Sequence, residues 1–380
     1  MILIYVQHLL GSGHLQRIRL ISEELFHQGK AVTIVSGGMP GKILDIPGID
    51  VVQLEPIRSE GIDFSQLVND EGIAVDDSIF ERRRDQLLEL YKQLAPKVVL
   101  IESFPFGRRA FRLELIALLK LAEKNRPDVF VACSIRDVLQ SRKLKRELES
   151  CEIIKQYFDA VLVHGDKSFI SLQQSFVSTV EIETFLHYTG YVAAAPVPRP
   201  LDHITATGDI IVSAGGGAAG QQIYQTAIEA AALARTDHQW RILVGSGISG
   251  SIFEDFCSMA TANVIVERNR ADYRDFLASC SLCICQAGYN SVLDILVTAA
   301  PALLIPFEGA GETEQLMRSE HMAGLKRIRQ LREKDLTAEQ LLEEVEKSFS
   351  DDPVDLPEID LCGAQNSADF LISQLQQIPA

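Results

Sequence analysis

Apolar residues in the first half of the chain form short runs separated by segments with helical spacing. The run at residues 1–10 is almost continuous, as in a parallel strand whose two faces are both covered. Leucines and isoleucines then recur at helical spacing from Leu15 to Leu25, and Gly29 ends the predicted helix. Further strands are predicted at residues 31–38, 50–55, 97–103, 129–135 and 160–165. This alternation predicts βαβ units and a parallel sheet.

The same pattern begins again after a break near the middle of the chain. Residues 193–208 hold three prolines and many small side chains, as a linker does. Strands are then predicted at residues 209–217, 240–247, 263–268, 281–288 and 301–307. We expect an α/β fold with two doubly wound parallel-sheet, Rossmann-like domains facing across a cleft. The expected parts are a first domain at 1–195, a linker at 196–208, a second domain at 209–362 and a terminal helix at 363–380 that packs back on the first domain.

Composition narrows the classes of partner. The 380 residues carry a formal net charge of -16, which argues against a sequence-independent grip on nucleic acid or on an anionic membrane. No run of apolar residues is long enough for a membrane helix, and no charged segment precedes the first apolar run, so we expect a soluble cytoplasmic protein. A small anionic ligand is still compatible with this charge, because helix N-termini bind phosphates through local backbone dipoles.

The seven cysteines indicate reduced thiols rather than a disulfide framework. Cys280, Cys283 and Cys285 form a C-x-x-C-x-C cluster that invites a metal interpretation. We prefer a buried strand, in which Cys283 and Cys285 face the same side as small core residues. We therefore expect no metal and no cofactor.

A glycine-rich turn, Gly11-Ser12-Gly13-His14, joins the first predicted strand to the first helix. Ligands of parallel sheets favour this place. A dinucleotide site is a poor fit, because the third glycine of that fingerprint is missing and no acid ends the second strand. His14 stands near the positive end of a helix, where an imidazole stays neutral and can act as a general base. Alternatively, it caps the helix or packs against the sheet.

Two carboxylates at predicted strand ends are candidates for orienting His14. These are Glu102 and Asp137, and Asp137 has a second interpretation as the N-cap of the next helix. Between them lies a stretch of aromatic and basic residues, Phe104, Phe106, Arg108, Arg109, Phe111 and Arg112. It is compatible with an anionic or lipid-linked acceptor and peripheral membrane contact, but a surface turn entering a helix is favoured.

Loops in the second half predict an anion site. Gly215, Gly216 and Gly217 follow a strand and open a helix, so that backbone amides can approach a diphosphate. Arg268 and Asn269 follow another strand and suit a nucleobase edge or a phosphate.

The segment CQAGYNSVLDIL is the most specific of these loops. Gly288 ends a strand, Asn290 and Ser291 begin a helix, and Asp294 lies one turn further on, where it could accept bonds from ribose hydroxyls. A simple S-x-x-D capping box is the alternative. Glu314 and Gln315 end a following glycine-rich loop and are placed to bind sugar hydroxyls, although carboxylates at a helix start also suit the helix dipole.

These residues carry a family resemblance. The segment AGYNSVLDILVTAAPALLIPFEGAGETEQ, with the GGG loop upstream, resembles the C-terminal domain of family 28 glycosyltransferases, which have the GT-B architecture. GSGHLQR is similar to the loop that this family shares with the nucleotide-sugar hydrolase of pseudaminic acid synthesis.

The resemblance implies an inverting, metal-independent glycosyltransferase that uses a nucleotide-sugar donor, has UDP as the nucleotide and needs no cofactor. It makes Gly215, Gly216, Gly217 and Ser291 diphosphate contacts, Asp294 the ribose ligand, and Glu314 and Gln315 the sugar contacts. His14 is then the base or a diphosphate contact, and Gly13 is a further residue of the donor site. The acceptor, whether a sugar, a lipid-linked compound or a small molecule, stays open. A nucleotide-sugar hydrolase or epimerase and a non-catalytic nucleotide-sugar-binding protein are the alternatives.

Overall fold

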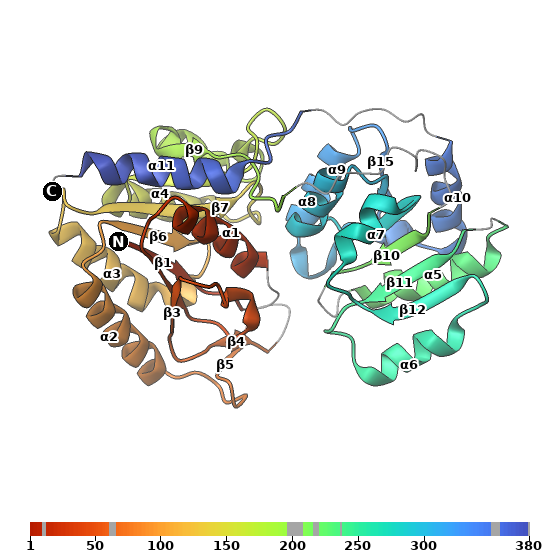
Figure 1. Ribbon diagram of the computed structural model, residues 1–380, viewed down its shortest axis with the longest axis horizontal. Coiled ribbons are helices and arrows are strands. Elements are labelled where there is room, and N and C mark those ends of the chain that lie inside the picture. The colour runs from red at the N-terminus through yellow and green to blue at the C-terminus, as the bar shows by residue number, and fades with distance from the viewer. Residues whose placement is uncertain are drawn as a thin grey trace. The chain divides into compact units, whose positions relative to one another are not determined.

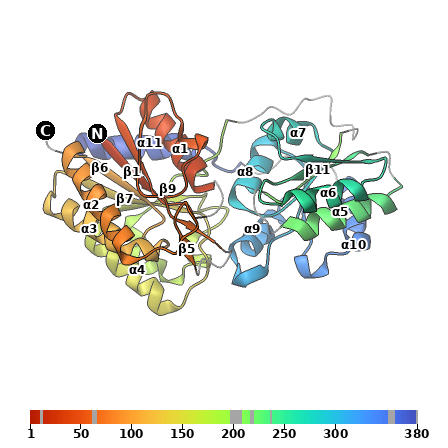
Figure 2. The ribbon, with the colours of Figure 1, turned by 90° about the horizontal axis from the view of Figure 1, so that it is seen from below.

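The computed structural model describes residues 1–9, 13–60, 66–195, 208–215, 220–235, 238–350 and 358–378. The chain divides into two compact units, one made of residues 1–193 and 359–380 and the other of residues 194–358 (Figures 1 and 2). Each unit is a parallel α/β sheet flanked by helices, so the predicted fold class is confirmed. Of the predicted linker, residues 196–207 lie outside the described residues.

The described part of the first unit holds a parallel sheet of seven strands in the order β3-β2-β1-β6-β7-β8-β9. Its strands are β1 (Ile2–Val6), β2 (Val32–Ser36), β3 (Asp50–Gln53), β6 (Val98–Glu102), β7 (Phe130–Arg136), β8 (Ala160–His164) and β9 (Leu186–Tyr188), with the separate antiparallel pair β4 (Arg58–Ser59) and β5 (Leu67–Val68). Its helices are α1 (Gly13–His27), α2 (Asp77–Leu94), α3 (Arg112–Lys124), α4 (Leu144–Tyr157) and α11 (Gly363–Gln377), with short 3-10 turns at Lys42–Leu44, Arg109–Phe111, Leu172–Gln174 and Val177–Phe185. The strands β1, β2, β6 and β8 are buried along their whole length, which explains their continuous apolar runs.

The last helix belongs to the first unit. Helix α11 packs against α1 (Figure 1), Gln28 Nε2 donates a hydrogen bond to Asp369 Oδ1 at 2.8 Å, and the rings of Phe130 and Phe370 meet edge to face. A bridge between Val192 and Cys362 joins the chain on either side of the second unit. Residues 359–362, assigned to the second domain from the sequence, therefore lie in the first unit, because their pairing partners do.

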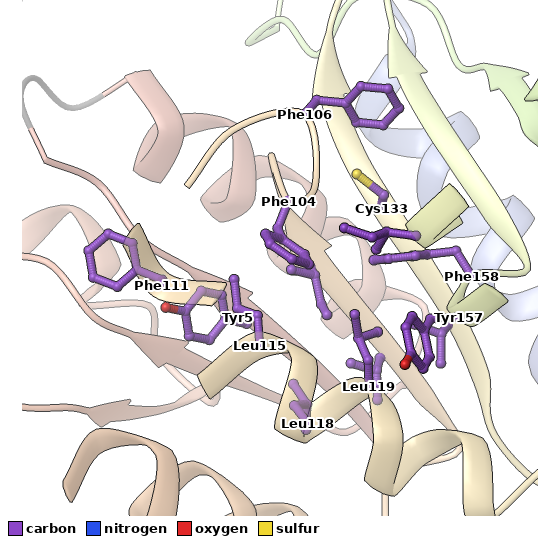
Figure 3. Close-up of a cluster of buried hydrophobic side chains, with 14 of the residues drawn as sticks. Tyr5, Phe104, Phe106, Phe111, Leu115, Leu118, Leu119, Cys133, Tyr157 and Phe158 are labelled. Carbon is purple, nitrogen blue, oxygen red and sulfur yellow. The ribbon is translucent and has the colours of Figure 1, made fainter. Parts of the chain in front are cut away.

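The aromatic residues that follow β6 fill the core of the first unit. Figure 3 shows Phe104, Phe106 and Phe111 among the buried side chains around α3, and each is at most 4% exposed. The less favoured alternative, in which this stretch meets an anionic or lipid-linked acceptor, therefore does not hold for these three aromatic side chains. They follow a buried strand and enter a buried helix face, and in this position apolar side chains pack inward.

The described part of the second unit holds six parallel strands in the order β12-β11-β10-β13-β14-β15. They are β10 (Ile210–Ser213), β11 (Trp240–Val244), β12 (Val264–Arg268), β13 (Leu282–Cys285), β14 (Ala302–Leu304) and β15 (Ile328–Gln330). The helices are α5 (Gln221–Leu233), α6 (Gly250–Met259), α7 (Tyr273–Ser279), α8 (Tyr289–Thr298), α9 (Glu314–Met322) and α10 (Ala338–Phe349), with 3-10 turns at Gly309–Gly311 and Glu333–Asp335.

Cys283 and Cys285 lie in β13 and are fully buried. Among the described residues, no group of three His, Cys, Asp or Glu side chains is arranged to hold a metal ion. In the same part of the chain, no helix has both the length and the apolar character that a bilayer crossing requires.

The sequence pattern missed the last strand of each sheet, β9 and β15. Both are three-residue edge strands whose positions are largely half-exposed, and β15 carries Arg329 and Gln330. Such short polar strands have no apolar run to reveal them, and they form because a neighbouring strand offers its hydrogen-bonding edge.

Candidate functional site

Both sheets reverse their strand order at one point. In the first unit β1 pairs with β2 on one side and β6 on the other, and in the second unit β10 pairs with β11 and β13. Ligands of open parallel sheets bind beyond the carboxyl ends of the strands at such a reversal. Glu102 ends β6 and His14 follows β1, while Gly215 follows β10 and Gly288 follows β13. The sequence-predicted residues therefore gather at the two reversals, one in each unit.

His14 is the second residue of α1, and its ring meets Glu102. Gly13 begins the helix, and His14 Nδ1 lies 2.6 Å from Glu102 Oε1. The His14 side chain is 17% exposed and that of Glu102 is fully buried. Because an ionised carboxylate accepts hydrogen bonds, Nδ1 is the nitrogen that carries the proton, and Nε2 is left as an acceptor. Gly11 and Ser12 of the same turn lie outside the described residues.

Two further groups donate to the same carboxylate oxygen. Glu102 Oε1 accepts a hydrogen bond from the Arg17 guanidinium and another from Ser103 Oγ, at 2.7 Å from the serine. Burial acts to raise the pKa of Glu102, but its electrostatic interaction and hydrogen bond with His14, together with the charges of Arg17 and Arg108, outweigh burial. The pKa of Glu102 therefore lies below its ordinary value, and the carboxylate is ionised.

The His14 ring is neutral in this setting. Burial lowers the pKa of His14 to about 3; Glu102 acts to raise it, while the charges of Arg108 and Arg136 lower it further. Desolvation disfavours the charged imidazolium, so burial outweighs the neighbouring carboxylate. A buried neutral imidazole held by a carboxylate has the form of a general base with its orienting partner.

Asp137 is buried elsewhere at the same sheet edge. Its Oδ2 accepts a hydrogen bond from the Tyr191 hydroxyl at 3.2 Å. Helix α4 begins at Leu144 with Lys143 at its N-cap, so the alternative that Asp137 caps this helix is wrong. Glu102 is thus the carboxylate in contact with the His14 ring. Nearby, burial lowers the pKa of His8, whose side chain packs beneath Gly38.

The basic residues of the stretch after β6 have separate roles. Arg109 and Arg112 both pair with Glu149 of α4, at 2.5 Å and 2.7 Å. Arg108 adopts a left-handed backbone conformation with φ of 57° and lies close enough to Glu102 to affect its pKa. The favoured interpretation as a surface turn entering a helix describes Arg109 and Arg112, whereas Arg108 turns toward the sheet edge.

In the second unit, Gly215 follows β10 with φ of 72°, a backbone conformation that residues other than glycine rarely adopt. The Tyr224 hydroxyl fixes the neighbouring backbone by accepting hydrogen bonds from Ala214 N at 3.1 Å and Gly245 N at 3.2 Å. The ends of β10 and β11 are thereby held together. Gly216 and Gly217 lie outside the described residues.

Helix α8 starts at this reversal with an open N-terminus. Gly288 is the N-cap with φ of -62° and ψ of 151°, and no side-chain hydrogen bond caps the helix there. Among the described atoms, a β-carbon on Gly288 would meet only Ser291 Oγ, 3.8 Å away. Asn290 and Ser291 lie in the first turn, where no helical carbonyl precedes their amides. The capping-box alternative is wrong, because Ser291 lies inside the helix rather than at its N-cap.

The acidic and amide residues expected to bind ribose and sugar make other contacts as well. Asp294 Oδ1 accepts a hydrogen bond from Arg274 Nε of α7 at 2.7 Å. Gln315 Oε1 accepts one from Phe307 N at 3.1 Å, and Glu314 is the first residue of α9 and is 7% exposed. Their roles toward a ligand stay predictions.

Arg268 and Asn269 help to fix the loops around β11. The Arg268 guanidinium donates to Ile248 O at 2.9 Å and lies 4.2 Å from the centre of the Phe253 ring, while Asn269 N donates to Val244 O at 3.0 Å. Arg268 is the last residue of β12 rather than part of a loop. A role in binding a nucleobase or phosphate stays a prediction.

Two arginines at the site were missed from the sequence. Arg17 binds Glu102, and Arg318 of α9 is 1% exposed and donates to Ala287 O at 3.0 Å, joining α9 to the loop before α8. Arg17 lies three residues after His14, a spacing that places both on one helical face. That spacing is the signal that would have found it.

Comparison with known proteins finds similarity in sequence to the second unit. Residues 210–369 match the glycosyltransferase family 28 C-terminal domain. Over 160 residues the chain is 26% identical to the UDP-N-acetylglucosamine–N-acetylmuramyl-(pentapeptide) pyrophosphoryl-undecaprenol N-acetylglucosamine transferase of Xanthomonas oryzae pv. oryzae, strain MAFF 311018. The matched part is 41% of this chain and 36% of that relative.

Solved structures are similar along the whole chain. The glycotransferase of kitacinnamycin superposes with a TM-score of 0.63 at 14% identity, covering 99% of this chain and 95% of the other. MurG of Acinetobacter baumannii gives 0.61 at 14% identity, with 99% of each chain covered. The spinosyn rhamnosyltransferase SpnG, complexed with thymidine diphosphate, gives 0.59 at 15% identity, covering 100% of this chain and 97% of the other. The second unit thus matches the glycosyltransferase family 28 C-terminal domain in sequence, and the chain along its whole length has the GT-B fold of these solved structures.

Proposed function

We propose that this protein transfers a sugar from a nucleotide-diphosphate sugar, with UDP as the nucleotide, to an acceptor hydroxyl. The reaction inverts the anomeric configuration, needs no bound metal and uses His14 as the general base. The observation that carries this proposal is the neutral, partly buried His14 ring with Nδ1 held by Glu102 at 2.6 Å. The family 28 match of the second unit supports the donor.

We assign the donor to the second unit. The diphosphate binds the amides of Asn290 and Ser291 at the start of α8 and the glycine loop from Gly215 through Gly217, because both offer backbone N–H groups to an anion. The ribose binds Asp294 Oδ2, since Arg274 occupies the other oxygen.

The donor sugar binds Glu314 and Gln315 at the start of α9. Arg318, further along the same helix, ties α9 to the loop before α8 and so fixes the place of both side chains. Arg268 and Asn269 bind a nucleobase edge or a phosphate of the donor. Their hydrogen bonds to backbone carbonyls also hold the loops around β11 in place.

The proposed chemistry moves one proton and one glycosyl group. The acceptor hydroxyl gives its proton to His14 Nε2 while its oxygen bonds to the anomeric carbon. The bond from that carbon to the diphosphate breaks, and the diphosphate leaves with the bonding electrons. Glu102 stabilises the imidazolium that forms, as the third member of such an array does.

The first experiment measures thermal stability against UDP, GDP, CDP, dTDP and their sugar conjugates. A ligand at a hundred times its Kd adds about 2.7 kcal/mol to the free energy of unfolding. A shift confined to one nucleotide series identifies the donor. The matching sugar conjugate is then incubated with candidate acceptors, among them the pyrophosphoryl-undecaprenol acceptor in the relative's name and small-molecule acceptors.

Variants test the base. His14→Gln is expected to lower the transfer rate by roughly 10²–10⁴-fold. His27→Gln, at the exposed end of the same helix, is the control and leaves the rate unchanged. Addition of EDTA also leaves it unchanged. Equal turnover by His14→Gln contradicts the assigned base, and consumption of the donor without any acceptor shows a hydrolase or epimerase instead.

A further inference from the structure

The first turn of α1 carries two side chains that bind the same atom. His14 and Arg17 are three residues apart and therefore lie on one face of the helix. Both contact Glu102 Oε1 at the end of β6, His14 through Nδ1 and Arg17 through its guanidinium. Arg17 is 2% exposed, and Glu102 is fully buried. A buried arginine thus contacts the same carboxylate oxygen that holds the imidazole.

Burial keeps the His14 ring neutral, and the Glu102 carboxylate acts against burial. A negative charge within hydrogen-bond distance favours the protonated imidazolium, by about 1–3 pH units for close pairs. A second, permanent positive charge on the same oxygen opposes that effect, because the guanidinium is always protonated. The arrangement keeps the hydrogen bond that the ring donates to Glu102 while offsetting part of the carboxylate charge.

We propose that Arg17 is a positioning residue, which neutralises Glu102 so that His14 keeps one proton, on Nδ1, and presents an unprotonated Nε2. The role of that nitrogen as a base rests on the proposed function. The protonation state itself does not, because it follows from the contacts of α1 with β6.

Other charged groups act on His14 and stay in place in the test. Arg108 of the loop after β6 and Arg136 at the end of β7 both oppose protonation of the ring. Asp137, next to Arg136, is bonded to Tyr191, and burial lowers the pKa of His8. Arg17 donates a hydrogen bond to the very oxygen that holds the ring.

The direct test follows the His14 ring by NMR in histidine-labelled protein, with its signals assigned by their loss in His14→Gln. In the wild-type chain the ring stays unprotonated between pH 5 and 8. In Arg17→Gln and Arg17→Met the titration midpoint moves upward by about 1–3 pH units. Arg17→Lys, which keeps the charge, leaves the midpoint near its wild-type position. The folded state of each variant is checked by near-ultraviolet circular dichroism.

Glu102→Gln distinguishes the effect of the Glu102 charge on the His14 ring from the effect of the hydrogen bond that orients the ring. This variant removes the carboxylate charge, so the ring stays unprotonated, but it alters the hydrogen bond that sets the tautomer. Its transfer rate therefore falls by the same factor at every pH. Arg17→Gln instead loses activity mainly at low pH, about tenfold for each pH unit below the new midpoint, and recovers at high pH.

A folded Arg17→Gln or Arg17→Met chain whose His14 titration midpoint stays at its wild-type position overturns the inference. A raised midpoint in Arg17→Lys overturns it as well, since charge would then not be the cause. If the ring titrates as expected but the transfer rate does not follow it, Arg17 keeps its assigned role and the assignment of His14 as the base fails.

Discussion

At the scale of single residues, a buried ion pair holds the loops beneath the His14 site. Arg83 of α2 contacts Glu114 of α3 through Nε at 2.9 Å and Nη2 at 2.8 Å, and Tyr5 donates to the same carboxylate. Arg83 also donates to Gly37 O at 2.8 Å after β2. Burial, together with Glu114, raises the pKa of Tyr5, so its hydroxyl keeps its proton and remains a donor.

Neighbouring arginines allow a matched comparison of buried and exposed pairs. Arg83→Met leaves Glu114 buried without its partner, and we expect the first unit to lose about 3–5 kcal/mol of unfolding free energy. Arg82→Met removes the pair with Glu55, in which Arg82 is 57% exposed, and an exposed hydrogen bond to Ser78 Oγ, and costs less than about 1 kcal/mol. Urea unfolding of both variants measures the difference. Equal losses would show that burial does not set the worth of these pairs.

At the scale of elements, a substitution at the start of α8 is expected to affect the stability of the helix and the binding of the nucleotide in opposite directions. Gly288 has N-cap dihedral angles that other residues also adopt, and space surrounds its missing β-carbon. A carboxylate there satisfies helix amides and suits the helix dipole. The same carboxylate would lie where we place the diphosphate, and the two negative charges would repel each other.

Gly288→Asp is therefore expected to keep or slightly raise thermal stability while weakening nucleotide binding at least tenfold. Gly288→Ser offers a neutral cap of similar size and serves as the control, with a smaller loss of affinity. Calorimetric titration with UDP, or with whichever nucleotide stabilises the chain, measures both. Undiminished affinity in Gly288→Asp places the diphosphate elsewhere.

At the scale of the whole molecule, the chain leaves the first unit, builds the second and returns. Each unit has its own buried core, with separate clusters on the two faces of the first sheet and another in the second unit. The returning helix α11 contributes Leu371, fully buried, to the core that α1 also lines. Sequence-distant segments thus share one unit, and the cores should unfold separately.

Leu371→Ala is expected to lower the free energy of unfolding of the first unit by about 2–5 kcal/mol and to leave that of the second unit unchanged. Scanning calorimetry should show two unfolding transitions, and only the midpoint temperature of the first unit should fall in this variant. Bound nucleotide should raise only the midpoint temperature of the second unit. Leu233→Ala, 50% exposed on α5, is the control and changes little. If both transitions move together in Leu371→Ala, the units do not unfold independently.

The sequence by itself determined most of the elements and the two-unit α/β fold. A buried parallel strand is apolar along its length and a covered helix is apolar on one face, so residues such as Leu15 and Leu25 reveal their element through their near neighbours. The turns that carry His14 and Gly288 follow from the same local rules, because they join a strand to a helix.

Only the tertiary structure decided which side chains meet. Glu102 lies 88 residues from His14 and 85 from Arg17, and Arg274 reaches Asp294 from a different helix. It also turned Phe104, Phe106 and Phe111 into the core and brought α11 back to the first unit. Such contacts depend on strand order and helix packing, which join distant parts of the chain, whereas a sequence pattern reports only the burial of each segment.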